Sequence, residues 1–475
     1  MAMAPSSVSE QSKADLLPLT INRVHISQRA DKMNLPTIEA SNQESTGLGN
    51  YFISNYPPFS FWKPDYLPAI EKMLQQPAPT NVPLGLYLHI PFCRKRCKFC
   101  YFRVYTDKNA RDVEQYVTGL MKELELYAAT NYIGKRPLNY VYFGGGTPSY
   151  LSAKQLTEVF AGIKARMNWE KPEEVTFECE PGTLQRPKLE ALRELGVTRL
   201  SLGIENFQDR ILEINGRAHR SPEIFKAYGW CKELGFEQIN IDLIAGMVGE
   251  TWDNWKDCIK KTIEISPESV TIYQMELPYN TIFSKDMHKP ESEGTPDFAD
   301  WPTKRAWMQY AVEELKANGY DQSSAYTLVK RDAKVSFVYR DALWHGADLI
   351  GSGVASFGHL GGMHVQNLDQ WDDYLGALTA GRLPFQRALT LDNEEKLIRE
   401  MILQLKTGKV ERNYFQQKFG IDIVDRFKGA INELSKEGYL KQQNGTVALT
   451  SNGFLQIDKQ LPAFFLPKHR GVRYT

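Results

Sequence analysis

The sequence predicts an α/β protein built around a parallel sheet. Six short apolar segments between residues 84 and 275 alternate with longer segments of helical period. A strand that is followed by a helix must cross over to reach the next strand, so this series predicts parallel pairing with right-handed connections. The chain has 475 residues, enough for two or three domains and a large core.

The charge balance and the cysteine content argue against several classes of function. The 57 basic residues equal the 57 acidic residues in number, so we expect no nucleic-acid partner. No run of about 20 apolar residues is present, and the N-terminus lacks a charged-then-apolar signal, so we expect neither a membrane span nor secretion. Six cysteines are too few for a disulfide framework, which favours a reduced, cytoplasmic location. We also expect a monomer.

Composition divides the chain into five predicted segments. Residues 1–48 are polar and aperiodic, as in a flexible leader. Residues 49–80 begin with crowded aromatic and proline residues, which indicates either a lid over a site or a strap packed on the domain behind it. Residues 81–318 hold the strand–helix series and residues 319–388 an extension of it. Residues 389–475 alternate helical segments with short strand signals.

Period and composition place the individual elements. A helix is predicted over residues 112–129, because its apolar residues share one face, and Ser152 is a good N-cap for the next helix. The strands are apolar runs of four to seven residues, predicted over 84–90, 138–143, 175–178, 199–204, 238–244 and 269–275.

Three of these strands carry polar residues on one face. Strands buried on both faces of a parallel sheet normally read as continuous apolar runs. Here polar and apolar residues alternate toward the strand ends, and the polar set is Thr176, Glu178, Glu180, Arg199, Ser201, Glu205, Asn240 and Asp242. Burying so many polar groups costs several kcal/mol unless each finds a partner. We therefore expect a polar ligand at the C-terminal ends of the strands.

A cysteine motif follows the first strand. Cys93, Cys97 and Cys100 have the spacing C-x3-C-x2-C. Three thiolates this close can hold three irons of a cubane cluster and leave the fourth iron open for chemistry. The alternative is a zinc site closed by a histidine, for which His89 is the candidate.

The residues that flank the motif identify a family. The segment Tyr87-Leu-His-Ile-Pro-Phe-Cys93 resembles the oxygen-independent coproporphyrinogen III oxidase-like (HemN-like) branch of the radical S-adenosylmethionine (SAM) superfamily. The resemblance implies a [4Fe-4S] cluster held by the three cysteines, whose unique iron takes the amino and carboxylate groups of SAM. It also implies a partial (β/α)6 barrel of the TIM type, followed by a C-terminal winged-helix domain.

The same resemblance assigns the SAM contacts. The segment Gly144-Gly-Gly-Thr-Pro148 resembles the glycine-rich motif that meets the SAM amino group, here through Gly145, Gly146 and Thr147. Arg217 matches the arginine that meets the SAM carboxylate.

Further residues follow by the same comparison. Asp242 matches the residue on the ribose hydroxyls, and Glu205 stands where the family usually has glutamine. The adenine is expected beside Met275, and Phe99 in the cysteine loop is expected to contact the cofactor. Glu178 matches the glutamate of the third strand. Together with Tyr87, which matches a tyrosine packed against SAM, it is the predicted catalytic residue.

The resemblance implies reductive cleavage of SAM to a 5′-deoxyadenosyl radical that abstracts hydrogen from a small aromatic or tetrapyrrole substrate. The electron would come from a flavodoxin or ferredoxin, which we expect to dock on the basic cysteine loop. The oxidases carry a fourth cysteine where this chain has Phe102, and this difference leaves three activities open.

The favoured activity is a HemN-like (class C) methylation of an sp2 carbon, which uses two SAM molecules. The second SAM would bind at Gly351-Ser-Gly-Val-Ala-Ser356. The alternatives are coproporphyrinogen decarboxylation or other tetrapyrrole chemistry, and heme binding as a chaperone. No histidine motif for heme is found, because His345, His359 and His364 are scattered in the sequence.

Overall fold

The structure is a computed structural model that describes residues 52–278, 281–287, 298–443 and 445–471. The predicted leader lies outside the described residues. All the described residues belong to one compact unit, Thr46–Thr475, so the boundaries predicted within it stay predictions. No helix in the described part of the chain has the length and apolarity needed to cross a bilayer.

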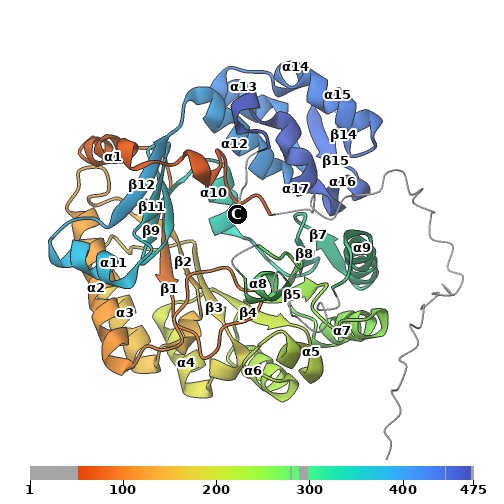
Figure 1. Cartoon of the computed structure of the whole chain (residues 1–475), viewed down its shortest axis with the longest axis horizontal. Helices are drawn as coiled ribbons and strands as arrows, with labels where there is room; N and C mark the ends of the chain where they lie inside the picture. The colour runs from red at the N-terminus through yellow and green to blue at the C-terminus, as the bar shows by residue number, and fades with distance from the viewer. Residues whose placement is uncertain (1–51, 279–280, 288–297, 444, 472–475) are drawn as a thin grey trace, which may run out of the picture. The chain divides into compact units, whose positions relative to one another are not determined.

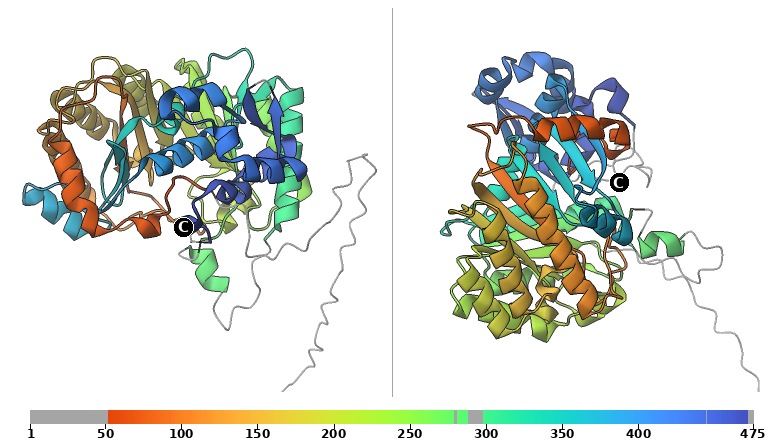
Figure 2. Two further views of the ribbon diagram at one scale, coloured as in Figure 1. Left: turned by 90° about the horizontal axis from the view of Figure 1, so that it is seen from above. Right: turned by 90° about the vertical axis from the view of Figure 1, so that its left-hand side faces the viewer.

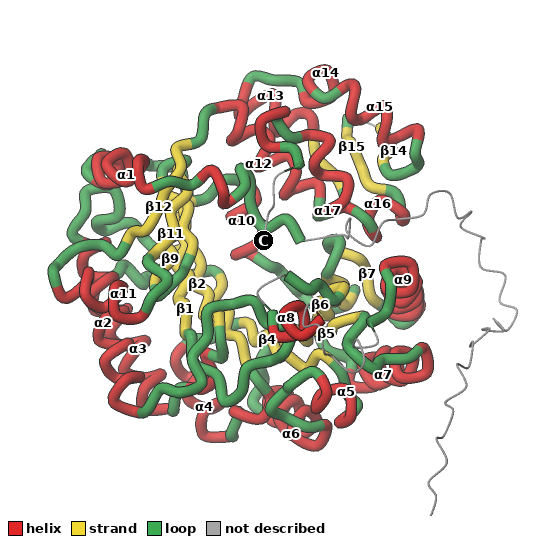
Figure 3. The backbone as a smooth tube through the Cα atoms, in the orientation of Figure 1, coloured by secondary structure: helices red, strands yellow, loops and turns green. Residues whose placement is uncertain are grey.

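Six parallel strands form the centre of the main sheet, as the sequence predicts. They pair in chain order, and helices cover their outer side (Figures 1 and 3). These strands are β1 (Leu84–Ile90), β2 (Leu138–Gly145), β3 (Glu174–Cys179), β4 (Arg199–Glu205), β5 (Gln238–Ala245) and β6 (Ser269–Gln274). The α/β class with a partial barrel is therefore confirmed.

Two of the crossover helices begin at side-chain caps, and Ser152 is the cap that the sequence predicts. Asn109 accepts hydrogen bonds from the first turn of α2 and Ser152 from the first turn of α3, and both form capping boxes. The helices of this part of the chain are α2 (Ala110–Ala128), α3 (Ala153–Arg166), α4 (Arg186–Leu195), α5 (Asp209–Ile214), α6 (Ser221–Glu233), α7 (Trp252–Ile265), α8 (Ile282–Met287) and α9 (Trp301–Ala317).

The sheet extends beyond the six predicted strands at both edges, to 12 strands in the order β12-β11-β10-β9-β1-β2-β3-β4-β5-β6-β8-β7. On one side β9 (Asp348–Ser352) is parallel to β1, and β10 (Phe357–Leu360), β11 (Met363–Asn367) and β12 (Phe385–Thr390) continue antiparallel. On the other side β8 (Thr327–Lys330) is antiparallel to β6, and β7 (Tyr320–Gln322) is antiparallel to β8. Two helices lie among these strands, α10 (Val338–Trp344) and α11 (Trp371–Thr379).

The C-terminal region has the order of elements expected of a winged helix. A three-stranded sheet, β13-β15-β14, packs with short helices. The helical stretch from Ile423 to Lys436 is divided in two at Phe427. The elements are α12 (Asn393–Leu405), β13 (Lys409–Glu411), α13 (Arg412–Phe419), α14 (Ile423–Arg426), α15 (Lys428–Lys436), β14 (Leu440–Gln443), β15 (Thr446–Leu449), α16 (Ser451–Leu455) and α17 (Ile457–Gln460).

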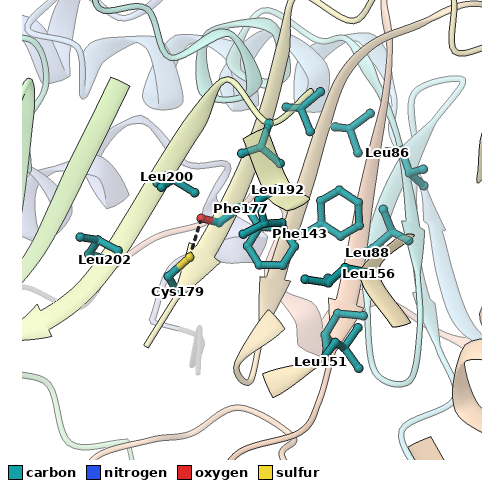
Figure 4. Packing of buried hydrophobic residues seen from close by; sticks show 14 of the residues in the cluster. Leu86, Leu88, Phe143, Leu151, Leu156, Phe177, Cys179, Leu192, Leu200 and Leu202 are labelled. Carbon is teal, nitrogen blue, oxygen red and sulfur yellow. Dashed lines mark hydrogen bonds between the residues drawn. The ribbon is translucent and has the colours of Figure 1, made fainter. Parts of the chain in front are cut away.

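Two hydrophobic cores hold these parts together. The larger core lies between the sheet and its helices, where Phe143, Phe177 and Leu200 interdigitate (Figure 4). The second core fills the C-terminal region and takes in Ile53 and Tyr56, which are 3% and 0% exposed. The aromatic N-terminal segment, with α1 (Leu67–Leu74), thus packs as a strap across the molecule (Figure 2).

A candidate active site at the C-terminal ends of the strands

A cavity of about 400 Å³ lies at the C-terminal ends of the parallel strands. A volume of this size is typical of small-molecule sites. Every predicted site residue except Tyr87 lines it, namely Cys93, Cys97, Phe99, Cys100, Gly145, Gly146, Thr147, Glu178, Glu205, Arg217, Asp242 and Met275. Residues spread over about 180 positions of sequence therefore face one space, where parallel-barrel enzymes place their sites.

The cysteine loop follows β1 and is fixed by hydrogen bonds. The Cys93 N–H donates to Tyr105 O at 3.0 Å, and the Cys100 N–H donates to Cys97 O at 3.2 Å. The Thr147 hydroxyl donates to Cys93 Sγ, and Arg217 Nη1 donates to Cys97 Sγ, each at 3.3 Å. Donors aimed at sulfur stabilise a thiolate, so the loop suits anionic sulfur ligands.

The three thiols fit a cluster better than a closed zinc site. Among the described residues, no three His, Cys, Asp or Glu side chains converge on a single ion. Cubane thiolates bind separate irons and need not converge. Burial raises the pKa of Cys93 to about 11 and of Cys100 to about 12, so it is bound iron that would make these sulfurs thiolates.

His89 does not complete a zinc site. Its Nε2 lies 3.2 Å from Arg103 O and its Nδ1 lies 3.3 Å from Tyr87 Oη, so both ring nitrogens have protein partners. Burial lowers the pKa of His89 to about 4, so the ring is neutral. His89 therefore supports the loop from behind.

The glycine-rich segment packs directly against the start of the cysteine loop. A Cβ on Gly145 would lie 2.4 Å from the His89 ring, and one on Gly146 would lie 2.8 Å from the backbone of Pro91. Gly145 also has φ of 111°, which favours glycine. Glycine is therefore required here partly because the segment packs closely on the cysteine loop, in addition to the predicted approach of a ligand.

Glu178 is held between two donors. The Tyr142 hydroxyl donates to Oε1 at 2.7 Å and the Gly145 N–H donates to Oε2 at 3.1 Å. Burial raises the pKa of Glu178 to about 7. Tyr87 stacks on Tyr142 at 5.9 Å and lies behind the cavity lining, so its catalytic role stays a prediction.

Arg217 presents a cationic group to the cavity. Its Nη2 donates to Gly203 O at 2.6 Å, and Glu205 Oε1 lies 3.6 Å from Nη1. Its Nε is buried and has no hydrogen-bond partner among the described residues. An orphaned guanidinium nitrogen beside the cysteine loop fits an anionic ligand such as the SAM carboxylate.

Glu205 adopts a backbone conformation that is rare outside glycine. Its φ of 65° coincides with a register shift between β4 and β5. Such strain persists where surrounding structure imposes it, often at functional sites. Burial raises the pKa of the Glu205 carboxyl to about 7. Whether it takes the place of the usual glutamine stays a prediction.

The polar strand face forms a hydrogen-bonded floor beneath the cavity, two members of which, Ser201 and Asp242, also line the cavity. In the floor, Asn240 donates to Ser201 Oγ and to Asp242 Oδ1, both at 2.9 Å, and Ser201 donates to Asp242 Oδ2 at 2.8 Å. This network orients Asp242 toward the cavity. Beside it, Phe99, Ile244 and Met275 share an apolar cluster of the kind that an adenine ring can pack against.

One part of the cavity lining was not predicted from the sequence. It is aromatic, and we name it the aromatic wall: Phe52, Tyr101, Phe102, Tyr273 and Tyr326. Phe52 packs edge-on to Tyr326 at 5.1 Å, and Tyr273 stacks on Tyr326 at 5.9 Å. The density of aromatic residues after residue 50 was the available signal, but nothing in the sequence pairs Phe52 with residues 273 and 326.

The segment predicted to hold a second SAM is occupied by its own hydrogen bonds. Ser352 and the Gly353 N–H donate to the buried Glu123, each at 2.9 Å, and Asn367 donates to Glu123 at 2.7 Å. The segment does not line the cavity. This geometry gives no support to a second SAM there.

Two of the scattered histidines turn out to be neighbours. His359 and His364 face each other across the β10–β11 pair, with their Nδ1 atoms 3.0 Å apart. They are 5% and 0% exposed, so this pair is buried.

Comparisons with known proteins agree with the geometry. The model of the radical SAM superfamily matches residues 87–262, and the model of the HemN C-terminal domain matches residues 391–455. The heme chaperone HemW of Haemophilus influenzae is 30% identical over 286 residues, which cover 59% of this chain and 72% of that protein. The oxygen-independent coproporphyrinogen III oxidase of Synechocystis sp. is 25% identical over 89% of this chain and 94% of its own length.

A solved structure shows the same fold. Coproporphyrinogen III oxidase (HemN) from Escherichia coli superposes with a TM-score of 0.76 at 22% identity, covering 87% of this chain and 96% of that one.

Proposed function

Because the chain belongs to the HemN-like branch of the radical SAM superfamily, we propose that it is an oxidoreductase acting on a carboxylate-bearing tetrapyrrole of the coproporphyrinogen class. Its cofactors are a [4Fe-4S] cluster and SAM. When bound, they supply hydrogen-atom abstraction by an adenosyl radical. The protein supplies positioning, charge and the exclusion of water.

The residues of the cavity divide this work. Cys93, Cys97 and Cys100 would hold the cluster. Arg217 would hold the SAM carboxylate through its unpaired Nε, and Asp242 would accept from the ribose hydroxyls. The aromatic wall would receive a flat conjugated or pyrrolic ring.

The observation that carries the proposal is the continuity of one cavity from the three cysteines to the aromatic wall. Hydrogen abstraction requires the substrate to lie next to the radical source, and a single cavity meets this condition. The similarity to the Synechocystis oxidase over 94% of its length supports the decarboxylating reaction. The occupied Gly351–Ser356 segment argues against the methylation favoured by the sequence.

Product analysis tests the proposal. The anaerobically reconstituted protein is incubated with SAM, a reductant and coproporphyrinogen III. We expect 5′-deoxyadenosine and CO2 to form together. S-adenosylhomocysteine with a methylated product would establish the methyltransferase instead.

A heme chaperone is the second candidate, favoured by the similarity to HemW. It predicts tight binding of heme without CO2 release. The buried pair His359 and His364 offers heme no accessible ligand, since His364 Nε2 is bonded to Tyr56 O at 2.8 Å and the two Nδ1 atoms face each other. A heme titration followed by absorbance would separate this candidate from the oxidase.

A further inference from the structure

One carboxyl group in the cavity has no part in the chemistry described so far. Glu276 lies two residues after the end of β6 and lines the cavity beside the aromatic wall. Its Oε1 accepts a hydrogen bond from the Phe52 N–H at 2.6 Å. Within the described part of the chain its other oxygen, Oε2, has no hydrogen-bond partner. One half of the carboxyl group is therefore fixed by the strap, and the other half is available to a ligand.

The cations near Glu276 are engaged elsewhere. Lys406 Nζ lies 2.6 Å from Asp458 Oδ1 and donates to Ile53 O at 2.6 Å, and both side chains of this ion pair are fully buried. Lys304 Nζ donates to Met275 O at 2.9 Å. No described cation therefore forms an ion pair with Glu276.

The Phe52 N–H and the charges of Lys406 and Lys304 favour the anion of Glu276, whereas the remaining groups that face it do not. Tyr101 and Tyr326 are phenols whose pKa values burial raises, and Asp458 adds a negative charge. Burial, as the largest cause, raises the pKa of Glu276 to about 8, and the charge of Asp458 adds to this shift. Glu276 is thus a neutral carboxylic acid at pH 7, and such a group can donate a hydrogen bond.

We propose that Glu276 is a specificity-determining residue, whose free oxygen donates a hydrogen bond to a carboxylate of the substrate while the aromatic wall holds the ring. The inference rests on the proposed function, because it assumes a substrate that carries carboxylates on its pyrrole rings. A neutral Glu276 can donate a hydrogen bond to an anion next to an apolar wall, whereas an ionised Glu276 would repel that anion.

Binding of two porphyrins tests this assignment directly. Coproporphyrin III carries four carboxylates, and its tetramethyl ester carries none but has the same ring. Fluorescence quenching on the full-length reconstituted protein would give both affinities at pH 6.5 and at pH 9.5. The porphyrin carboxylates are ionised at both pH values, so only protein groups change.

The wild-type protein should bind coproporphyrin III about 10- to 100-fold more tightly than the ester at pH 6.5, the range for one hydrogen bond to a charged group. This preference should shrink at pH 9.5, where Glu276 is ionised. Glu276→Gln keeps a donor without a charge, so its preference should persist at both pH values. Glu276→Leu should lose the preference at both.

Glu237→Gln, at an exposed residue before β5, is the matched control and should behave as the wild type. An unchanged preference in Glu276→Leu, or a Gln variant that keeps the pH dependence, would overturn the assignment. The proposed function fails separately. It is refuted if the wild type releases no CO2 from coproporphyrinogen III, whatever the porphyrin affinities are.

Discussion

The two ends of the cavity are built in different ways. At the cysteine end, the ligands lie within eight residues of one another and the supporting glycines follow the next strand. At the aromatic wall, Phe52 bonds to Glu276 across 224 positions of sequence and Ile53 bonds to Asp458 across 405. A short motif thus carries the cofactor chemistry, whereas distant segments assemble the surface that would face the substrate.

The largest effect is expected at the cysteine end. Cys97→Ala removes one of three cluster ligands, so 5′-deoxyadenosine formation should fall below detection and the iron content should drop. Cys231→Ala is the matched control, since Cys231 is a buried thiol in α6 away from the cavity, and it should retain iron. Radical formation at the native rate by Cys97→Ala would refute the cluster assignment.

The next largest effect is expected near the aromatic wall, where a buried ion pair holds the strap. Lys406→Met leaves Asp458 charged and fully buried, which should lower the free energy of unfolding by about 3–5 kcal/mol in denaturant titrations. The double variant Lys406→Met/Asp458→Leu should recover much of that loss. Lys260→Met removes an exposed pair with Glu264 and should change stability by about 0.5 kcal/mol or less.

If Lys406→Met lowers the free energy of unfolding no more than Lys260→Met does, the buried pair does not hold the strap. The comparison between the two ends would then lose its structural basis.

Glu276 predicts a pH dependence of stability at the same end. Its pKa is about 8 in the folded protein and near 4.5 in the unfolded chain. The stability that the neutral carboxyl group contributes is therefore fully present below pH 4.5 and is lost as pH rises through 8. Glu276→Gln removes this loss. The variant should therefore gain about 4 kcal/mol relative to wild type between pH 5 and pH 9. Parallel stability curves for the two proteins would contradict the raised pKa.

Arg217→Lys tests the predicted SAM contact beside the cysteine loop. Lysine keeps the charge but loses the planar fork, so the SAM dissociation constant should rise about tenfold. Equilibrium dialysis of SAM against the reconstituted protein measures this change. Arg186→Lys, at an exposed site on α4, should leave SAM binding as it is. Equal affinities for both variants would remove Arg217 from the SAM contacts.

The smallest effect concerns the predicted electron donor. Lys95 is exposed on the cysteine loop, whereas Arg94 pairs with Glu180 and Arg96 donates to Cys100 O. Lys95→Glu should slow cluster reduction by flavodoxin about threefold at low salt, because a rim charge mainly affects association. Reduction by dithionite should not change, and the exposed Lys441→Glu serves as the control. Equal slowing with both reductants would count against docking on this loop.

Local signals in the sequence were sufficient to predict the parallel strands and the cysteine end of the cavity. β1 covers the predicted residues 84–90, because an apolar run with a following loop needs no distant partner to be recognised. The polar face of β3, β4 and β5 was also predicted, since alternation along a strand is a local property. The structure added that Asn240, Ser201 and Asp242 satisfy one another, and that Ser201 and Asp242 also line the cavity.

Other assignments needed the fold. The small residues of Gly351–Ser356 suggested a ligand loop, but Glu123, more than 200 positions away, takes their hydrogen bonds. The six edge strands were missed because edge strands are short and weakly patterned. His359 and His364 became neighbours only through hairpin register.

By itself, then, the sequence determined the fold class, the cysteine loop and the cofactor chemistry, because these depend on short spacings and on residue types within one turn or strand. Only the tertiary structure decided what faces the cysteines. The aromatic wall, Glu276 and the Lys406–Asp458 pair come from six separate segments, and their proximity depends on packing and on buried charge. Such contacts form only when the whole sheet and the C-terminal region are assembled, so no local pattern encodes them.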